Sequence, residues 1–168
     1  MENREVNREQ STNKEVSRLS ADRSVVMEIR AMKIDDYDSV VDVWKRAGID
    51  YRPGGRESLD SMKRQMKAFG GLMLVAEDEG RVIGVALGSH DCRKGWINRL
   101  AVVPEMRRKG VANMLLARLE EEFAACGIGV VAALVSEDNM RSARMFKNSG
   151  FKLMKDINYF SKRQSADI

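Results

Sequence analysis

The stretch LAVVPEMRRKGVA, residues 100–112, joins a buried strand to an amphipathic helix through a short basic turn. The apolar run before Pro104 predicts a strand that ends there, because proline lacks the N–H that a strand ladder needs. From Val111 onward, apolar residues recur every fourth position, which predicts a helix over about 109–125. The first N–H groups of a helix have no partner within it and carry partial positive charge. This turn is therefore a candidate anion site.

The residues of the turn suit a pyrophosphate. Gly110 lets the backbone approach a ligand closely, and Ala112 keeps the next helical turn small. Arg107, Arg108 and Lys109 add positive charge, and each charge-assisted hydrogen bond contributes roughly 1.5–3 kcal/mol. The sequence has neither the G-K-[ST] of a nucleotide P-loop nor a G-x-G-x-x-G motif, so neither ATP nor a dinucleotide is indicated.

Strands and helices alternate around this stretch. The patterns predict strands at residues 25–31, 72–76, 82–89, 96–103, 130–135, 151–155 and 158–162, and helices at about 36–47, 57–69, 109–125 and 140–148. Strand–helix–strand crossovers imply parallel neighbours, and hairpins imply antiparallel ones. The expected fold class is α/β (α+β), a mixed, partly parallel central sheet of about six to seven strands flanked by about four helices. The wholly apolar strand at 130–135 is expected to be buried on both faces.

Length and composition indicate one domain. The chain has 168 residues, of which 43% are hydrophobic, enough for a single core. Residues 1–24 are polar and highly charged and predict a mobile arm, with the folded domain over residues 25–168. No apolar run approaches the roughly 18–20 residues of a membrane span. The N-terminus lacks the apolar segment of a secretory signal, so a cytoplasmic location without a membrane partner is expected.

Charge and metal-ligating residues narrow the function further. The formal net charge is +4, from 29 Lys and Arg against 25 Asp and Glu. This mild excess fits an anionic ligand, and no aromatic–basic motif accompanies it to favour nucleic acid. Two cysteines and one histidine, His90, are too few for a zinc site or a disulfide framework, so no metal is expected.

Two motifs resemble those of the GNAT superfamily of N-acetyltransferases. RRKGVA (107–112) is similar to the family signature R/Q-x-x-G-x-G/A, and it likewise follows a strand and precedes a long helix. NMRSARMFKNSGF (139–151) is similar to N-x-x-A-x-x-L-Y-x-x-x-G-F, with serine, methionine and phenylalanine replacing alanine, leucine and tyrosine. The resemblance covers about residues 27–162. It implies the family fold, acetyl-CoA as the acetyl donor and an amine as the acceptor.

The resemblance also implies which residues bind acetyl-CoA. In the family, amides of the signature loop hold the pyrophosphate, and the fourth strand, which splays from the fifth, contacts the acetyl and pantetheine groups. Carried onto this sequence, the contacts fall on Leu100, Ala101, Val102, Val103, Arg107, Arg108, Lys109, Gly110, Val111, Ala112, Asn139, Ser142 and Phe146. Asn139 is equally expected as a helix N-cap, and the two roles are compatible.

Two positions that ionise in many family members do not ionise here. Asn98 stands where many members have a glutamate base, and Phe146 stands where many have a tyrosine acid. An α-amine with a pKa near ~8 costs only about 1–1.5 kcal/mol to deprotonate at pH 7, whereas a lysine side chain costs about 4–5 kcal/mol. We therefore expect direct attack within a ternary complex and a preference for weakly basic amines.

Other residues are candidates for the acceptor site. His90, just after the third strand, and Tyr159, on the expected last strand, could transfer protons; the alternatives are an ordinary loop histidine and a partly buried structural tyrosine. Tyr51 and Arg52 lie in a loop that shapes the acceptor pocket in the family. With Asn98, they are the candidates for substrate binding.

Three functions fit these observations. The first is an N-acetyltransferase acting on a small-molecule or peptide amine. The second is an acyl-CoA-binding or regulatory module with little catalysis, which the non-ionisable Asn98 and Phe146 suggest. The third is an RNA- or ribosome-associated module that uses the basic arm and surface. Pairing of two copies through the final strands, to form a homodimer, is compatible with this fold.

Overall fold

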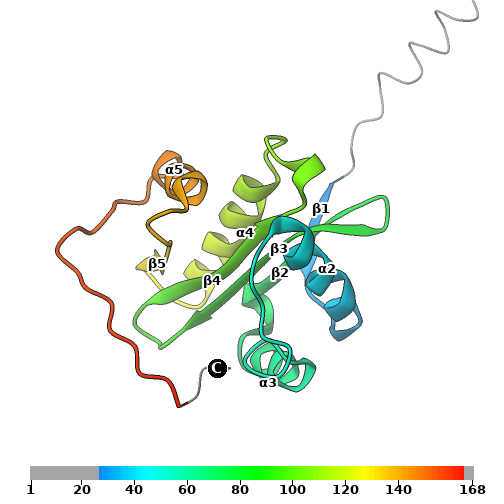
Figure 1. The fold of residues 1–168 in the computed structure, drawn as a ribbon, viewed down its shortest axis with the longest axis horizontal. Coiled ribbons are helices and arrows are strands. Elements are labelled where there is room, and N and C mark those ends of the chain that lie inside the picture. The colour runs from blue at the N-terminus through cyan, green and yellow to red at the C-terminus, as the bar shows by residue number, and fades with distance from the viewer. Residues whose placement is uncertain (1–26, 165–168) are drawn as a thin grey trace, which may run out of the picture.

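The computed structural model describes residues 27–164; the expected arm at 1–24 and its boundary at residue 25 lie outside them. Five strands form one sheet in the order β1-β2-β3-β4-β5 (Figure 1). The pairs from β1 to β4 are antiparallel, and β4 and β5 are parallel. The predicted mixed, partly parallel sheet is therefore confirmed. The strands are Glu28–Ala31 (β1), Met73–Asp78 (β2), Arg81–His90 (β3), Gly95–Val102 (β4) and Val131–Ala133 (β5).

Helices cover both faces of this sheet. Val40, Val43 and Trp44 of the second helix in chain order are buried against one face, as their spacing predicts. On the other face, a Cβ added at Gly84 or Gly88 would come within 3.0 or 2.9 Å of side chains from the helix after β4. No helix within residues 27–164 is long and apolar enough to cross a bilayer. The helices are Ile34–Asp36 (η2), Tyr37–Ala47 (α2), Leu59–Phe69 (α3), Gly70–Leu72 (η3), Pro104–Met106 (η4), Val111–Ala125 (α4) and Met140–Asn148 (α5).

The core lies between the sheet and these helices. Trp44 of α2 and Phe123 of α4 are the two largest side chains that are fully buried. Phe123 packs so closely on β4 that a Cβ added at Gly95 would lie 2.7 Å from its ring carbons. Glycine is therefore needed at the start of β4 because the ring occupies the space of a side chain.

The C-terminal segment differs from the sequence prediction. Strands are predicted at 151–155 and 158–162, but residues 149–164 form no strand and run in an arc outside the helices and sheet (Figure 1). Apolar side chains that would have lined the buried faces of these strands, such as Leu153 and Phe160, are exposed. Apolar residues such as these form a strand only where the edge of a sheet is available to pair with them. The described chain thus has five strands instead of six to seven.

The last strand of the sheet is also shorter than predicted. β5 covers three residues instead of 130–135, and its residues are only half-buried. Val130 and Leu134, on either side of it, are 54% and 58% exposed. The prediction of burial on both faces is wrong. β5 is the last strand at one edge of the sheet in the part of the chain that the structure describes, and its side chains are only partly covered.

Candidate functional site

The fourth strand has an open edge towards the fifth. β4 pairs with β5 over three residues only, and the ladder ends where Ile97 faces Ala133. Beyond that pair, no strand within residues 27–164 pairs with this edge of β4. Unpaired N–H and C=O groups on a strand edge can bond to an extended ligand. The gap agrees with the separation of the fourth and fifth strands that the family resemblance implies.

A β-bulge at Asn98 brings two neighbouring side chains to the same face. The register between β3 and β4 shifts at Leu87 and Gly88, which leaves Asn98 as the extra residue. Asn98 Nδ2 donates to Ser89 Oγ at 2.8 Å. Ser89 follows Gly88, which faces α4, so the Ser89 side chain lies on the opposite face of the sheet. The guanidinium of Arg99 lies over the Trp44 ring of α2. Both side chains therefore project from β4 towards α2 and the loop that follows it, in keeping with the way bulges re-aim side chains.

The turn before α4 presents a row of main-chain N–H groups. Arg108 and Gly110 adopt φ values of 64° and 84°, so the backbone is left-handed at both positions. No side chain caps α4, and no acceptor in residues 27–164 bonds to the main-chain N–H groups of residues 108–113. Such groups at a helix N-terminus attract anions. The turn therefore offers the donors that phosphate oxygens require.

The basic side chains of this turn have different surroundings. Arg107 donates from Nη2 to the Ala47 carbonyl at 3.1 Å and from Nε to the Val102 carbonyl at 3.3 Å. Lys109 and Arg108 are exposed, and Lys109 Nζ lies 3.4 Å from a methionine sulfur. Arg107 thus joins the turn to the C-terminal end of α2. Its contact with a pyrophosphate stays a prediction.

The second family motif forms α5. Asn139 Oδ1 accepts a hydrogen bond from the Ser142 N–H at 3.1 Å, so the expected N-cap is confirmed. Phe146 is 9% exposed, and its ring centroid lies 5.1 Å from that of Phe151. These residues therefore stabilise α5 and its packing. Their contacts with CoA stay predictions.

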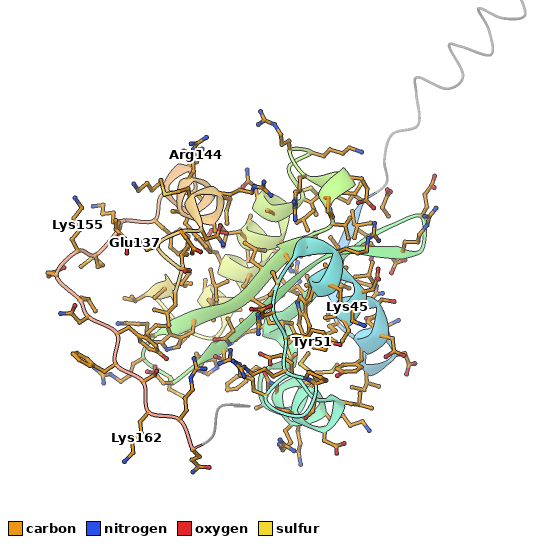
Figure 2. The ribbon with its side chains drawn as sticks, viewed as in Figure 1. Lys45, Tyr51, Glu137, Arg144, Lys155 and Lys162 are labelled. Carbon is orange, nitrogen blue, oxygen red and sulfur yellow. The ribbon has the colours of Figure 1, made fainter. Side chains whose placement is uncertain are left out.

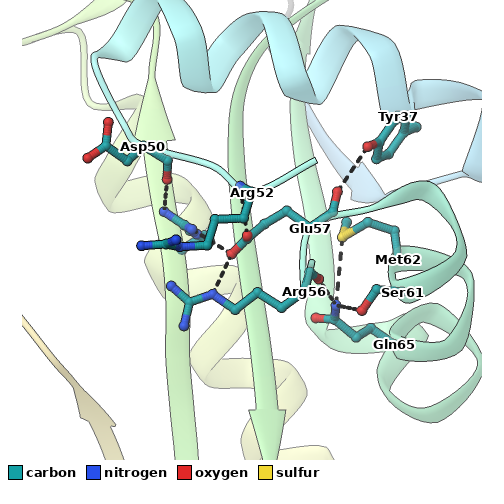
Figure 3. Close-up of polar contacts among 9 residues, drawn as sticks. Tyr37, Asp50, Arg52, Arg56, Glu57, Ser61, Met62 and Gln65 are labelled. Carbon is teal, nitrogen blue, oxygen red and sulfur yellow. Dashed lines mark hydrogen bonds and ion pairs between the residues drawn. The ribbon is translucent and has the colours of Figure 1, made fainter. Parts of the chain in front are cut away.

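The loop after α2 forms a polar network that the sequence did not predict (Figure 3). Glu57 is only 5% exposed. Its Oε1 accepts from Arg99 Nη2 at 2.6 Å and from Arg56 Nε at 2.8 Å, and its Oε2 accepts from the Arg52 main-chain N–H at 3.0 Å. The Tyr37 hydroxyl donates to the Glu57 carbonyl at 2.9 Å. One carboxylate thus ties the loop to both α2 and β4.

Glu57 is held in its ionised form. Burial alone would raise the pKa of this carboxyl. The hydrogen bond and positive charge of Arg99, with the bonds from Arg52 and Arg56, outweigh burial and hold the pKa of Glu57 below its usual value. In the sequence alone, Arg56 and Glu57 look like exposed charged residues just before a helix. Arg99, distant in the sequence, explains why Glu57 is buried.

The predicted substrate-binding residues meet on this side of β4. The Tyr51 ring is half-buried, with its centroid 6.2 Å from that of Trp44, and Lys45 Nζ lies 5.7 Å from it; Figure 2 labels Tyr51 and Lys45. Arg52 joins the Glu57 network, and Asn98 projects towards the same side from β4. The structure therefore brings Tyr51, Arg52 and Asn98 to one face of the sheet. Their contact with a substrate stays a prediction.

The two candidates for proton transfer lie away from the open part of β4. His90 pairs with Gly95 at the far end of the β3–β4 ladder; its Nδ1 accepts from the Cys92 N–H, and its ring lies edge-on to Phe69. Tyr159 is 70% exposed on the segment after α5. Its expected position on a last strand is wrong, because that strand does not form. Neither predicted catalytic role gains support from these positions.

Comparison with known proteins places this arrangement among acyl-transfer enzymes. Residues 38–151 match the family model described as the acetyltransferase (GNAT) family. Acetyltransferase plu1384 of Photorhabdus laumondii is 38% identical over 113 residues, which cover 67% of this chain and 78% of that protein. The family match spans the open strand, the basic turn and α5.

Solved structures share the fold. Ard1 from Thermoplasma volcanium superposes with a TM-score of 0.69 at 22% identity, covering 77% of this chain and 85% of that one. The PaiA N-acetyltransferase from Thermoplasma acidophilum, solved in complex with coenzyme A, gives a TM-score of 0.69 at 20% identity, with 78% and 92% covered. At these identities the likeness shows the fold alone.

Proposed function

Because the chain belongs to the acetyltransferase (GNAT) family, we propose that it transfers the acetyl group of acetyl-CoA directly to a primary amine. The observation that carries the proposal is the unpaired row of N–H groups at residues 108–113, directly after the open strand β4. An anion site and an open strand edge are the two features that a long ligand with a pyrophosphate and an amide-containing arm needs.

The residues of the turn fit the donor. The backbone is left-handed at Arg108 and Gly110, a conformation common in anion-binding turns, and Lys109 adds an exposed positive charge. Gly110 has open space where a Cβ would be, so backbone can approach a phosphate there. The pyrophosphate of CoA would lie on this turn, and the open edge of β4 would hydrogen-bond the pantetheine amides.

The chain's own contribution to transfer is to hold both substrates in reach. Acetyl-CoA supplies an activated thioester whose thiolate, with a thiol-like pKa near ~8.5, leaves without a strong acid. The neutral amine attacks the acetyl carbon, the C–N bond forms and the C–S bond breaks. The nitrogen then loses a proton to solvent. Positioning of this kind can lower the activation barrier by about 7–11 kcal/mol. Transfer therefore does not require Asn98 or Phe146 to ionise.

The absence of an ionisable group at Asn98 and Phe146 favours an acceptor that is weakly basic. We therefore propose that an α-amine, or another amine of similar pKa, is acetylated in preference to a lysine side chain. The same two residues carry the second candidate, an acyl-CoA-binding module with little catalysis.

The test is release of CoA thiol from acetyl-CoA at pH 7, with the acetylated product identified by mass. The acceptors are a dipeptide with a free α-amine and a peptide whose only amine is a lysine side chain. Faster turnover of the α-amine is expected. Faster turnover of the lysine would contradict the preference, and bound acetyl-CoA with no turnover of any amine would favour the binding module.

A further inference from the structure

Three arginines and one buried carboxylate lie together beside β4 (Figure 3). Arg56 and Arg99 both donate to Oε1 of Glu57, at 2.8 and 2.6 Å. Arg52 bonds to the same carboxylate through its main chain, and its side chain extends from the loop in the same direction as that of Arg56. Asp50 contributes only its carbonyl to Arg99, and its carboxylate points away. Within residues 27–164, the guanidinium groups of Arg56 and Arg99 thus share one carboxylate, so these two side chains bring one positive charge more than Glu57 offsets.

The cluster also has hydrogen-bond donors in excess. Arg56 is bound through Nε alone, and its terminal NH₂ groups have no partner among the residues the structure describes. Its side chain is 56% exposed, so a solute can reach these groups. Beneath Arg99, the Trp44 indole N–H is buried, again without a partner in residues 27–164. In the free protein the exposed groups of Arg56 bond to water, which the oxygens of an anionic ligand can replace.

Arg99 is held in place before any ligand arrives, and Arg56 is restrained by one hydrogen bond. Arg99 is 16% exposed and is held by Glu57, by the Asp50 carbonyl at 2.9 Å and by the Trp44 ring, 5.7 Å from its Cζ. The bond from Nε to Glu57 likewise sets the plane of the Arg56 guanidinium. A planar fork held in place matches the two oxygens of a carboxylate or phosphate, and little side-chain entropy is lost on binding.

The cluster borders the open part of β4. Arg99 is one residue from Asn98 and one from Leu100, a separation of about 3.3 Å along a strand. Through the bulge, Arg99 and Asn98 project to the face of α2, opposite to the face that α4 covers. A molecule bound over the α2 face of the sheet would therefore lie beside the unpaired edge of β4, on the side opposite to α4.

The geometry points to an acceptor amine that also carries an anionic group, a carboxylate or a phosphate, bound by Arg56 with Arg99 beside it. This inference rests on the proposed function. A lone ammonium would be repelled by the surplus positive charge, whereas an anionic group on the same molecule offsets that repulsion. Nearby guanidinium groups also disfavour the charged form of the amine, which assists attack because neither Asn98 nor Phe146 can take its proton.

The experiment measures binding of small amines to protein saturated with CoA, by the side-chain Nε–Hε NMR signals of its arginines. The probes are phosphoethanolamine against ethanolamine, for phosphate, and glycine against glycinamide, for carboxylate. We expect one or both anionic amines to shift the signals of Arg56 and Arg99, with little effect from their neutral partners. Arg56→Gln should weaken that binding at least about tenfold. Arg64→Gln, which removes an exposed arginine of α3, should leave it unchanged.

The outcomes separate the inference from the proposed function. If CoA binds but neither anionic amine binds more tightly than its neutral partner, the inference is wrong and the donor site stands. Shifts of the Arg56 signal by CoA alone would assign the cluster to the donor instead. If the anionic amines bind equally well to Arg56→Gln and to wild type, the inference is also wrong, and the cluster only stabilises the loop after α2. Failure of folded protein to bind CoA at all would contradict the proposed function itself.

Discussion

The Arg107 side chain donates to the carbonyl of Ala47, the last residue of α2, across 60 residues of sequence. The same guanidinium bonds to the Val102 carbonyl at the end of β4. A cation at a helix C-terminus satisfies carbonyls that have no partner in the helix and interacts well with its dipole. The first basic residue of the turn therefore fixes how α2, β4 and the donor site are joined.

Replacement of Arg107 should consequently reduce stability. Arg107→Gln loses two hydrogen bonds from a charged donor, and we expect a loss of about 1–3 kcal/mol in the free energy of unfolding, measured by urea. Arg108→Gln, at an exposed position of the same turn, should change it by less than about 0.5 kcal/mol. If Arg107→Gln unfolds at the same urea concentration as wild type, the bracing role is wrong.

The contact between Phe123 and Gly95 gives a prediction about packing. A methyl group in Gly95→Ala would lie 2.7 Å from two ring carbons of a buried aromatic side chain. We expect destabilisation of about 1–3 kcal/mol from overpacking. The matched control is Gly129→Ala, because nothing lies within 4 Å of the position its methyl group would take and its φ is not positive. Comparable urea midpoints for the two variants would contradict the packing described.

The low pKa of Glu57 predicts how stability depends on pH. The carboxyl pKa is raised by burial but lowered further by Arg99 and the other donors, so its value in the folded protein lies below the ordinary 4.5. Its contribution is therefore complete above about pH 4.5 and is lost as the pH falls through the folded value. Glu57→Gln should cost about 3 kcal/mol at pH 7, because it leaves Arg99 without its carboxylate.

The difference between wild type and Glu57→Gln should narrow between pH 7 and pH 3, measured as free energies of unfolding. Glu137→Gln removes a charge from an exposed loop and should have little effect at either pH. A difference that stays constant over this range would mean that the Glu57 carboxylate does not stabilise the fold through its charge.

The acceptor, and not an enzymic base, should set the pH dependence of turnover. Because Asn98 and Phe146 cannot ionise near neutrality, kcat/KM for an amine should rise about tenfold per pH unit until the amine's own pKa is reached. For two acceptor amines with different pKa values, kcat/KM should therefore stop rising at different pH values. His90→Gln should leave both profiles in place. A common inflection for both amines, lost in that variant, would identify His90 as the base.

The sequence predicted the parts of the fold that local patterns control. Apolar periodicity located α2 and α4, and the sequence placed a basic, glycine-containing turn between β4 and α4. The segment after α5 was predicted wrongly. Apolar residues at 151–155 and 158–162 suit strands, but the local sequence does not say whether the edge of a sheet is available to pair with them.

The polar site was predicted least well. Glu57 and Arg99 are 42 residues apart, and each looks like an ordinary surface charge in its own segment. Their meeting depends on the loop after α2 crossing β4, and on the bulge at Asn98, which no local pattern indicates. The family resemblance pointed to Tyr51, Arg52 and Asn98 as candidates for substrate binding, but not to the carboxylate of Glu57 beside them.

The donor site is tested by calorimetry of acetyl-CoA binding to wild type, Gly110→Glu and Gly127→Glu. Both glycines have positive φ, 84° and 73°, and open space at the Cβ position, so the two variants add the same charge and similar strain at opposite ends of α4. We expect binding on the order of micromolar by wild type and Gly127→Glu, and its loss in Gly110→Glu. Equal binding by all three folded proteins, or none by wild type, would contradict the donor site.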